Sequence, residues 1–155
     1  MKTTSPIVNF DEKPLYNKEQ IKKILPHRDP FLFIDEVRDL GDDFIIGTKF
    51  VKKEEDYFKG HFPGSPVMPG VLQLETMAQV GGVLILSTVE NPENYLTYFM
   101  KIDNAKFKQK VIPGDTIIFR LELISPIRRG LCHMHGKGFV DGKVVVEADL
   151  LAQIS

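Results

Sequence analysis

Residues 60–79 read Gly-His-Phe-Pro-Gly-Ser-Pro-Val-Met-Pro-Gly-Val-Leu-Gln-Leu-Glu-Thr-Met-Ala-Gln, a loop rich in glycine and proline that runs into an apolar segment. Proline fixes φ and glycine permits backbone conformations that other residues avoid, so this loop can hold the His61 imidazole in a set direction. The apolar segment carries one carboxylate, Glu75. A histidine titrates near neutral pH and apolar surroundings raise the pKa of a carboxyl, so the pair indicates acid–base chemistry.

The apolar segment predicts a long helix, which begins at Pro69 and Gly70 and ends near residue 89, before Asn91 and Pro92. This helix is apolar on nearly every side, so we expect a sheet to surround it rather than a flat surface to support it. One short helix and six strands are predicted around it: a helix at 17–25 and strands at 31–37, 44–51, 95–102, 115–125, 130–140 and 143–152. The order of these elements predicts an α+β fold with an antiparallel sheet.

The composition describes one soluble globular domain. The chain has 155 residues, of which 43% are hydrophobic and 26% are charged, enough to form one core. Residues 1–16 are polar and without periodicity, so we expect an N-terminal tail or linker there, followed by a single domain at 17–155. The net charge of −1 gives no overall attraction to nucleic acid or to anionic lipid.

Two further features bear on localisation. The single cysteine, Cys132, excludes an intramolecular disulfide, and the first residues lack the pattern of a secretion signal. The longest apolar run, at 80–86, is far shorter than the roughly 20 residues that a membrane span requires. We therefore expect a cytoplasmic protein without a membrane segment.

The start of the long helix offers a third chemical group. The amides of Gly70 and Val71 have no helical partner there and point the positive end of the helix dipole outward, which suits a carbonyl oxygen that gains negative charge. Two structural alternatives remain at this point: Glu75 as a core carboxylate bonded by Gln79, and His61 as a loop residue bonded to nearby backbone. Spacing does not decide whether His61 and Glu75 meet within one chain or across a dimer interface.

Four segments together resemble the FabZ-type 3-hydroxyacyl-acyl carrier protein dehydratases: Leu-Pro-His-Arg-Asp-Pro-Phe-Leu-Phe-Ile-Asp at 25–35, residues 60–79, Tyr98-Phe99 and Pro113-Gly114-Asp115. The likeness covers residues 17–152. It implies the hotdog fold, in which a sheet wraps one long helix and two chains join their sheets. It also implies dehydration of (3R)-hydroxyacyl chains, carried as phosphopantetheine thioesters on acyl carrier protein, to trans-2-enoyl products in fatty acid synthesis.

The resemblance assigns roles to three residues. His61 corresponds to the catalytic base and Glu75 to the catalytic acid, contributed by different subunits of a homodimer, and the Gly70 amide corresponds to the oxyanion donor. The sister dehydratase/isomerases carry aspartate at the Glu75 position, so glutamate is similar to the dehydratase-only branch. The family uses no metal or redox cofactor, and the assembly that the resemblance favours is a trimer of dimers.

Other residues carry weaker expectations, each with a structural alternative. We expect an acyl tunnel lined by Phe62, Met68, Val71 and Tyr98, although apolar residues near a core helix are commonly only core. Basic residues could steer the acidic carrier protein, although such charges are mostly just solvated. They are Lys106, Lys108, Lys110, Arg128 and Arg129.

Two histidine motifs are interpreted as structural. His133 and His135 alternate along one predicted strand, but a zinc site needs three or four ligands and no further cluster is evident. His27 and Arg28 follow the first predicted helix and belong to the family signature, where we expect them to act as structural supports. No metal site is predicted.

Two other functions fit the same architecture. A hotdog thioesterase would use a carboxylate to activate water and would release free carrier thiol, whereas a non-catalytic acyl-binding module would keep the tunnel without turnover. The combination of His61 and Glu75 argues against both. The tail at 6–16 is similar to the linker of fused deacetylase-dehydratase chains of lipid A synthesis, so the chain could be the dehydratase half of such a fusion, acting on longer 3-hydroxyacyl chains.

Overall fold

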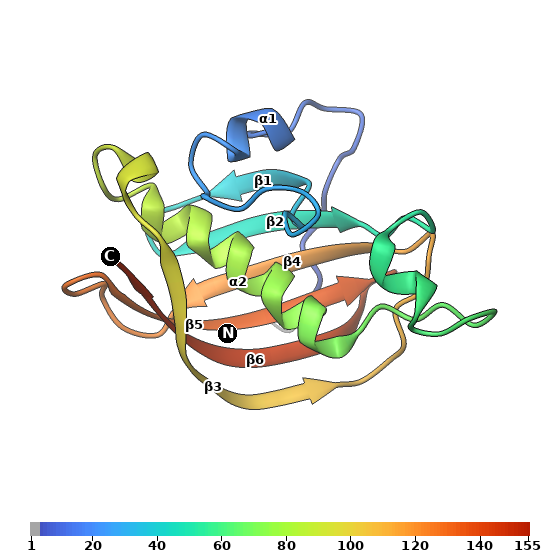
Figure 1. Ribbon diagram of the computed structural model, residues 1–155. Helices are drawn as coiled ribbons and strands as arrows, with labels where there is room; N and C mark the ends of the chain where they lie inside the picture. The colour runs from blue at the N-terminus through green and yellow to red at the C-terminus, as the bar shows by residue number, and fades with distance from the viewer. Residues whose placement is uncertain (1–3) are drawn as a thin grey trace.

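Six antiparallel strands curve around helix α2 (Gly70–Leu86) in the computed structural model, which describes residues 4–155 (Figure 1). The spatial order of the strands is β1-β2-β4-β5-β6-β3. Their bounds are β1 Glu36–Leu40, β2 Phe44–Phe50, β3 Thr97–Phe107, β4 Thr116–Leu123, β5 Leu131–Val140 and β6 Lys143–Ile154. Three short helices connect them: α1 Lys18–Ile21 and the 3₁₀ turns η1 Asp56–Lys59 and η2 Pro92–Asn94.

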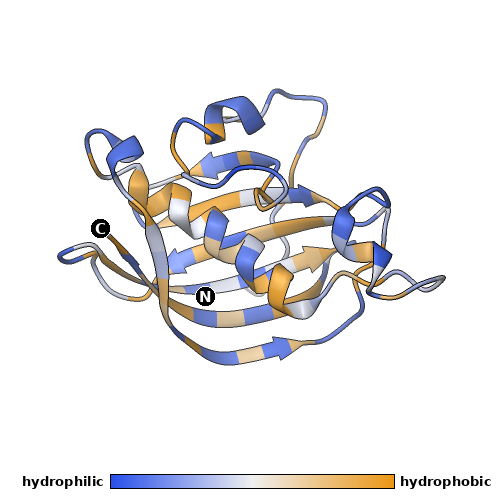
Figure 2. Ribbon diagram, in the orientation of Figure 1, coloured by the Kyte–Doolittle hydropathy of each residue, from blue (hydrophilic) through white to orange (hydrophobic). Residues whose placement is uncertain are grey.

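Helix α2 forms the centre of the core, as predicted. It begins at Gly70 after Pro69 and ends at Leu86, three residues earlier than the predicted end at 89. Twelve of its seventeen residues are buried, and Figure 2 shows hydrophobic stretches toward both of its ends. Sheet and helix approach so closely that a Cβ added at Gly47 of β2 would lie 2.9 Å from a methyl carbon of Val80. The hotdog arrangement expected from the resemblance is confirmed.

One predicted strand is wrong in its first half. Residues 31–35 are not in a strand, and β1 begins only at Glu36. The Gln79 side chain of α2 explains the difference, because its amide occupies backbone groups that a strand would pair. Gln79 Nε2 donates to the Phe31 carbonyl at 2.8 Å, and Gln79 Oε1 accepts from the amides of Phe33 at 2.8 Å and Ile34 at 3.3 Å. Periodicity cannot reveal a side chain that takes the place of a strand.

The described part of the predicted tail, residues 4–16, lies along the β1 side of the sheet. Tyr16 pairs with Val37 of β1 through two backbone hydrogen bonds. The Phe10 ring lies 4.7 Å below the Arg38 guanidinium and 6.0 Å from the Phe50 ring. The predicted helix at 17–25 also begins as expected, with Asn17 as its N-cap, but it ends at Ile21.

The opposite side of the sheet ends in a free strand edge. Within residues 4–155, strand β3 pairs only with β6, and nine of its eleven residues are exposed. Five of these exposed residues are large and apolar: Tyr98, Phe99, Met100, Ile102 and Phe107. An unpaired edge with exposed apolar side chains favours association with another strand.

Among residues 4–155, no helix is both long and apolar enough to cross a membrane.

Candidate active site

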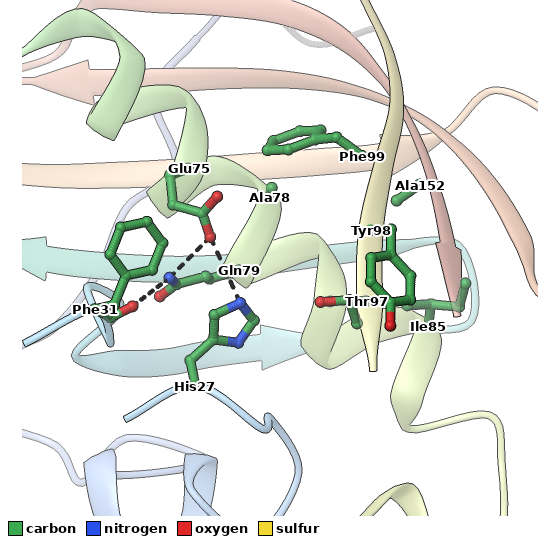
Figure 3. A pocket seen from close by; sticks show the side chains of 11 residues that line it. His27, Phe31, Glu75, Ala78, Gln79, Ile85, Thr97, Tyr98, Phe99 and Ala152 are labelled. Atoms are coloured by element: carbon green, nitrogen blue, oxygen red, sulfur yellow. Dashed lines mark hydrogen bonds and ion pairs between the residues drawn. The ribbon is translucent and has the colours of Figure 1, made fainter. Parts of the chain in front are cut away.

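Glu75 lies on the face of α2 that looks toward β3 and β6. There it lines a cavity of about 230 Å³, hereafter the acid cavity (Figure 3). The helix contributes residues of one face, and the cavity is closed by the loop after α1 and by the first residues of β3. Its other lining residues are His27, Phe31, Ala78, Gln79, Gly82, Ile85, Thr97, Tyr98, Phe99 and Ala152.

The surroundings of Glu75 favour the protonated carboxyl. Burial raises the pKa of Glu75, and the hydrogen bond from Gln79 opposes this increase. Gln79 Nε2 donates to Glu75 Oε2 at 3.0 Å, and His27 Nε2 lies 3.5 Å from the same oxygen. Because a general acid must hold its proton before the reaction, a raised pKa extends its working range to higher pH.

His61 lines a different cavity of about 650 Å³, hereafter the base cavity, at the start of α2. Its Nδ1 lies 2.7 Å from the Val67 carbonyl oxygen. A carbonyl only accepts hydrogen bonds, so Nδ1 carries a proton and donates, and in the neutral ring the lone pair then lies on Nε2. The Phe62 ring stacks on the imidazole at 4.0 Å. The loop therefore directs Nδ1 to the backbone and leaves Nε2 as the ring nitrogen that is available to a substrate.

Gly70 opens α2 beside His61 in the base cavity. Within residues 4–155, neither the Gly70 amide nor the Val71 amide donates to a protein group. A side chain at residue 70 would collide with Phe107, because a Cβ there would lie 2.8 Å from its ring. Glycine thus lets the last residue of β3 close over the helix start while the free amides remain beside His61.

His61 and Glu75 lie in separate cavities within one chain. The base cavity includes Phe107 at the last position of β3, whereas the acid cavity includes Thr97 at the first position. These two residues are the ends of an extended strand of eleven residues. His61 and Glu75 are 14 positions apart in the sequence, but the fold places them at opposite ends of the free β3 edge.

Three of the four predicted tunnel residues divide between the two cavities. Met68 and Val71 line the base cavity, Met68 buried and Val71 71% exposed. Tyr98 lines the acid cavity and is half exposed. Phe62 lines neither of the two and instead stacks on His61.

The predicted basic residues also divide between the two ends of β3. Lys108 and Lys110 line the base cavity, and Lys108 forms an ion pair of 3.0 Å with Glu147. Arg128 pairs with Leu131 in the hairpin between β4 and β5. Leu131 lies opposite Gln153 of β6, and Gln153 lies opposite Tyr98 of β3. The arginines thus lie near the first residues of β3. In the described chain, the ammonium groups of Lys106 and Lys110 and both guanidinium groups lack carboxylate partners.

One of the two strand histidines, His135, contacts a carboxylate. His135 Nδ1 lies 2.5 Å from Asp149 Oδ1, across the β5–β6 pair. In residues 4–155, no three His, Cys, Asp or Glu side chains come together as ligands for a metal ion.

The sequence does not predict that His27 lies beside Glu75. The family signature pointed to it, but as a structural support, whereas the structure places its ring against the Glu75 carboxyl. Gln79 was considered only as a partner of Glu75, yet it also fixes the backbone of residues 31–34. No local signal in the sequence could have shown that these two side chains converge on one carboxylate oxygen.

Comparisons with known proteins agree with this architecture. Residues 25–149 match the family model described as FabA-like domain. A FabZ 3-hydroxyacyl-[acyl-carrier-protein] dehydratase of Syntrophotalea carbinolica is 47% identical over 85% of this chain and 90% of that protein. Another, of Actinobacillus pleuropneumoniae, is 46% identical over 90% of this chain and 92% of that protein.

Bifunctional relatives extend the match toward the tail. A bifunctional LpxC/FabZ enzyme of Bacteroides thetaiotaomicron is 53% identical over 97% of this chain, which spans about a third, 32%, of that protein's length. A solved structure, the dehydratase heterocomplex ApeI:P from Xenorhabdus doucetiae, shares the fold. It has a TM-score of 0.71 and 17% identity, covering 86% of this chain and 89% of that one. The chain therefore belongs to the FabA-like family, among its FabZ-type members.

Proposed function

We propose that the chain removes water from (3R)-3-hydroxyacyl groups carried on acyl carrier protein and so forms trans-2-enoyl products for fatty acid synthesis. One observation carries this proposal: a histidine with a free Nε2 and a carboxyl of raised pKa lie at the two ends of one exposed apolar strand. The dehydratase relatives support the substrate class. No metal or redox cofactor enters the proposed reaction.

A second copy of the chain, paired along β3, completes the site. Two copies of one strand related by a twofold axis run antiparallel, so the Thr97 end of one lies against the Phe107 end of the other. The acid cavity of each protomer then adjoins the base cavity of its partner. The exposed apolar residues of β3 become buried in this interface. We propose this homodimer, or a trimer of such dimers, as the active form.

The chemistry follows from the three groups. The Gly70 amide donates to the thioester carbonyl, whose oxygen gains negative charge as His61 Nε2 removes a proton from C2. Glu75 of the opposite subunit gives its proton to the C3 hydroxyl, the C3–O bond breaks and water leaves. The electron pair of the broken C2–H bond becomes the C2=C3 double bond. Proton exchange with solvent restores neutral His61 and protonated Glu75.

Product analysis tests this proposal against a thioesterase. The chain is incubated with (3R)-3-hydroxyacyl carrier protein, and the carrier is weighed by mass spectrometry. We expect loss of one water with the acyl group still attached to the carrier. Release of free carrier thiol would assign the chain to the thioesterases instead.

Free cations at the composite site suit an acidic carrier protein. In the proposed dimer, Lys110 of one subunit and the two arginines of its partner, Arg128 and Arg129, lie around the same pair of cavities. These side chains have no carboxylate partner within the described chain, so their charge is available to a partner protein. We propose that they receive the carrier by charge attraction.

Reversing the charge of the two arginines should weaken binding of the carrier protein without changing the chemical step. We expect Arg128→Glu with Arg129→Glu to raise KM for the carrier-bound substrate roughly tenfold, with kcat little changed and a smaller effect at high salt. The matched control is Lys13→Glu with Lys23→Glu, which makes the same charge change on the β1 side of the sheet. An equal increase of KM in both double variants would contradict the docking role.

The match to bifunctional relatives bears on the length of the acyl chain in the substrate. It covers 150 of the 155 residues and so includes part of the segment before α1. We propose that the substrates include longer 3-hydroxyacyl chains of the kind used in lipid A synthesis. Comparing kcat/KM between short and long acyl chains tests this preference.

A further inference from the structure

The His27 ring faces the Glu75 carboxyl from the loop after α1. Its Nε2 lies 3.5 Å from Glu75 Oε2, and both side chains are largely buried, at 17% and 18% exposure (Figure 3). Both line the acid cavity. The proposed reaction uses Glu75 as the acid but gives no role to the imidazole beside it.

Hydrogen bonds with backbone groups hold both neighbours of Glu75 Oε2, His27 and Gln79, in place. The Arg28 guanidinium donates to the carbonyls of Lys22 at 2.9 Å, Leu25 at 2.9 Å and His27 at 2.6 Å, which fixes the turn that carries the imidazole. Gln79 is fixed by its three bonds to residues 31–34. Glu75 Oε2 thus faces two anchored side chains, whereas Oε1 has no hydrogen bond to any of residues 4–155.

The surroundings of Nδ1, the other ring nitrogen of His27, do not fix its tautomer. His27 Nδ1 is buried and has no hydrogen-bond partner within the described chain. The partner of one ring nitrogen normally decides which nitrogen carries the proton, so nothing on the Nδ1 side prevents Nε2 from carrying it. Burial lowers the pKa of His27, and Arg28 lowers it further, which favours a neutral ring. A neutral Nε2–H can donate to a carboxylate at Oε2.

We propose that His27 is a positioning residue for the dehydration described above: its Nε2–H holds Glu75 Oε2, turns Oε1 toward the cavity, and stabilises the carboxylate that remains after proton transfer. This role rests on the proposed acid function of Glu75. The other charged or titratable groups around the pair are Arg28 beside His27 and Tyr98 of β3. In the proposed dimer the partner's His61 joins them.

The test follows the Glu75 carboxyl directly, by ¹³C NMR of protein labelled at the glutamate side-chain carboxyl. Its signal is identified by its absence from Glu75→Gln. In His27→Phe, which keeps an aromatic ring without a donor, we expect Glu75 to titrate at higher pH, by roughly one pH unit, because its carboxylate has lost a donor. In the same variant kcat should fall roughly ten- to a hundredfold with KM little changed.

Three further variants make the result specific. His27→Gln restores an N–H donor, so its Glu75 titration and kcat should lie closer to the original protein than those of His27→Phe. His27→Ala repeats the comparison if the phenylalanine variant does not fold. His133→Phe, the same exchange on strand β5, should leave both readouts unchanged.

An unchanged Glu75 titration and unchanged kcat in His27→Phe or His27→Ala would overturn the proposal. A higher KM with normal kcat would do so as well, because it would mean that His27 contacts substrate. The NMR titration needs no turnover, so it still decides the effect of His27 on Glu75 if the unaltered chain fails to dehydrate its substrate. That failure would count against the proposed function alone.

Discussion

Glu75→Gln is expected to lower kcat roughly 10²- to 10⁴-fold, the range that removal of a general acid produces. Glutamine has nearly the same shape and can still accept the hydrogen bond from Gln79, but it has no acidic proton for the departing hydroxyl. The measurement is the initial rate of enoyl formation on the carrier at saturating substrate. KM should change little, because the acyl chain and carrier keep their contacts.

The fold should survive this exchange. Burial disfavours the charged carboxylate, and a neutral amide avoids this cost, so we expect the midpoint of urea unfolding to be equal or higher. Normal turnover by a folded Glu75→Gln variant would exclude Glu75 as the acid.

His61→Ala is expected to lower kcat by a similar factor, because no other group in the base cavity has a free lone pair of suitable basicity. Lys108 and Lys110 line the same cavity, but an ammonium group only donates hydrogen bonds. The rate of exchange of the C2 hydrogen with deuterated solvent measures this step separately from loss of the hydroxyl.

Replacement of a half-buried loop side chain should leave the core intact, so the thermal unfolding midpoint of His61→Ala serves as its control. If the C2 hydrogen still exchanges at the original rate in the folded variant, another group removes it.

Much of the fold could be predicted because its signals are local. Pro69 and Gly70 predicted the start of α2, and the apolar surface of that helix predicted a surrounding sheet. Asp141 and Gly142 predicted the last hairpin, and both adopt positive φ, 50° and 81°, as such a turn requires. Strand periodicity predicted strands at 115–125 and 130–140, whose bounds lie within two residues of those of β4 and β5.

Long-range contacts account for what could not be predicted. Residues 31–35 have the composition of a strand, but the Gln79 amide, 45 to 48 positions away, bonds their backbone instead. Strand β3 continues to Phe107, five residues beyond the predicted end at 102, through an irregular register against β6. Neither feature leaves a local pattern in the sequence.

In the candidate site, too, local features could be predicted and long-range ones could not. Residue type and setting pointed to His61 and Glu75 as candidates and predicted a raised pKa at Glu75, and burial raises that pKa in the structure. Spacing along the chain could not show that the two residues line separate cavities at opposite ends of β3. That separation is a property of the whole sheet, and it is the reason why we propose a site shared between two chains.

Complementation between two inactive chains tests this shared site most directly. His61→Ala and Glu75→Gln chains carrying different affinity tags are produced together, and dimers that hold one of each are purified. In such a dimer, one composite site lacks both groups, whereas the other has His61 from one chain and Glu75 from the other. The rate of enoyl formation per mixed dimer is compared with that of the unaltered dimer.

We predict that the mixed dimer recovers about half the activity of the unaltered dimer, since one of its two sites is intact. Each variant alone should remain inactive under the same conditions. Mixed dimers as inactive as their parents would contradict the shared site, because they would show that His61 and Glu75 must come from the same chain.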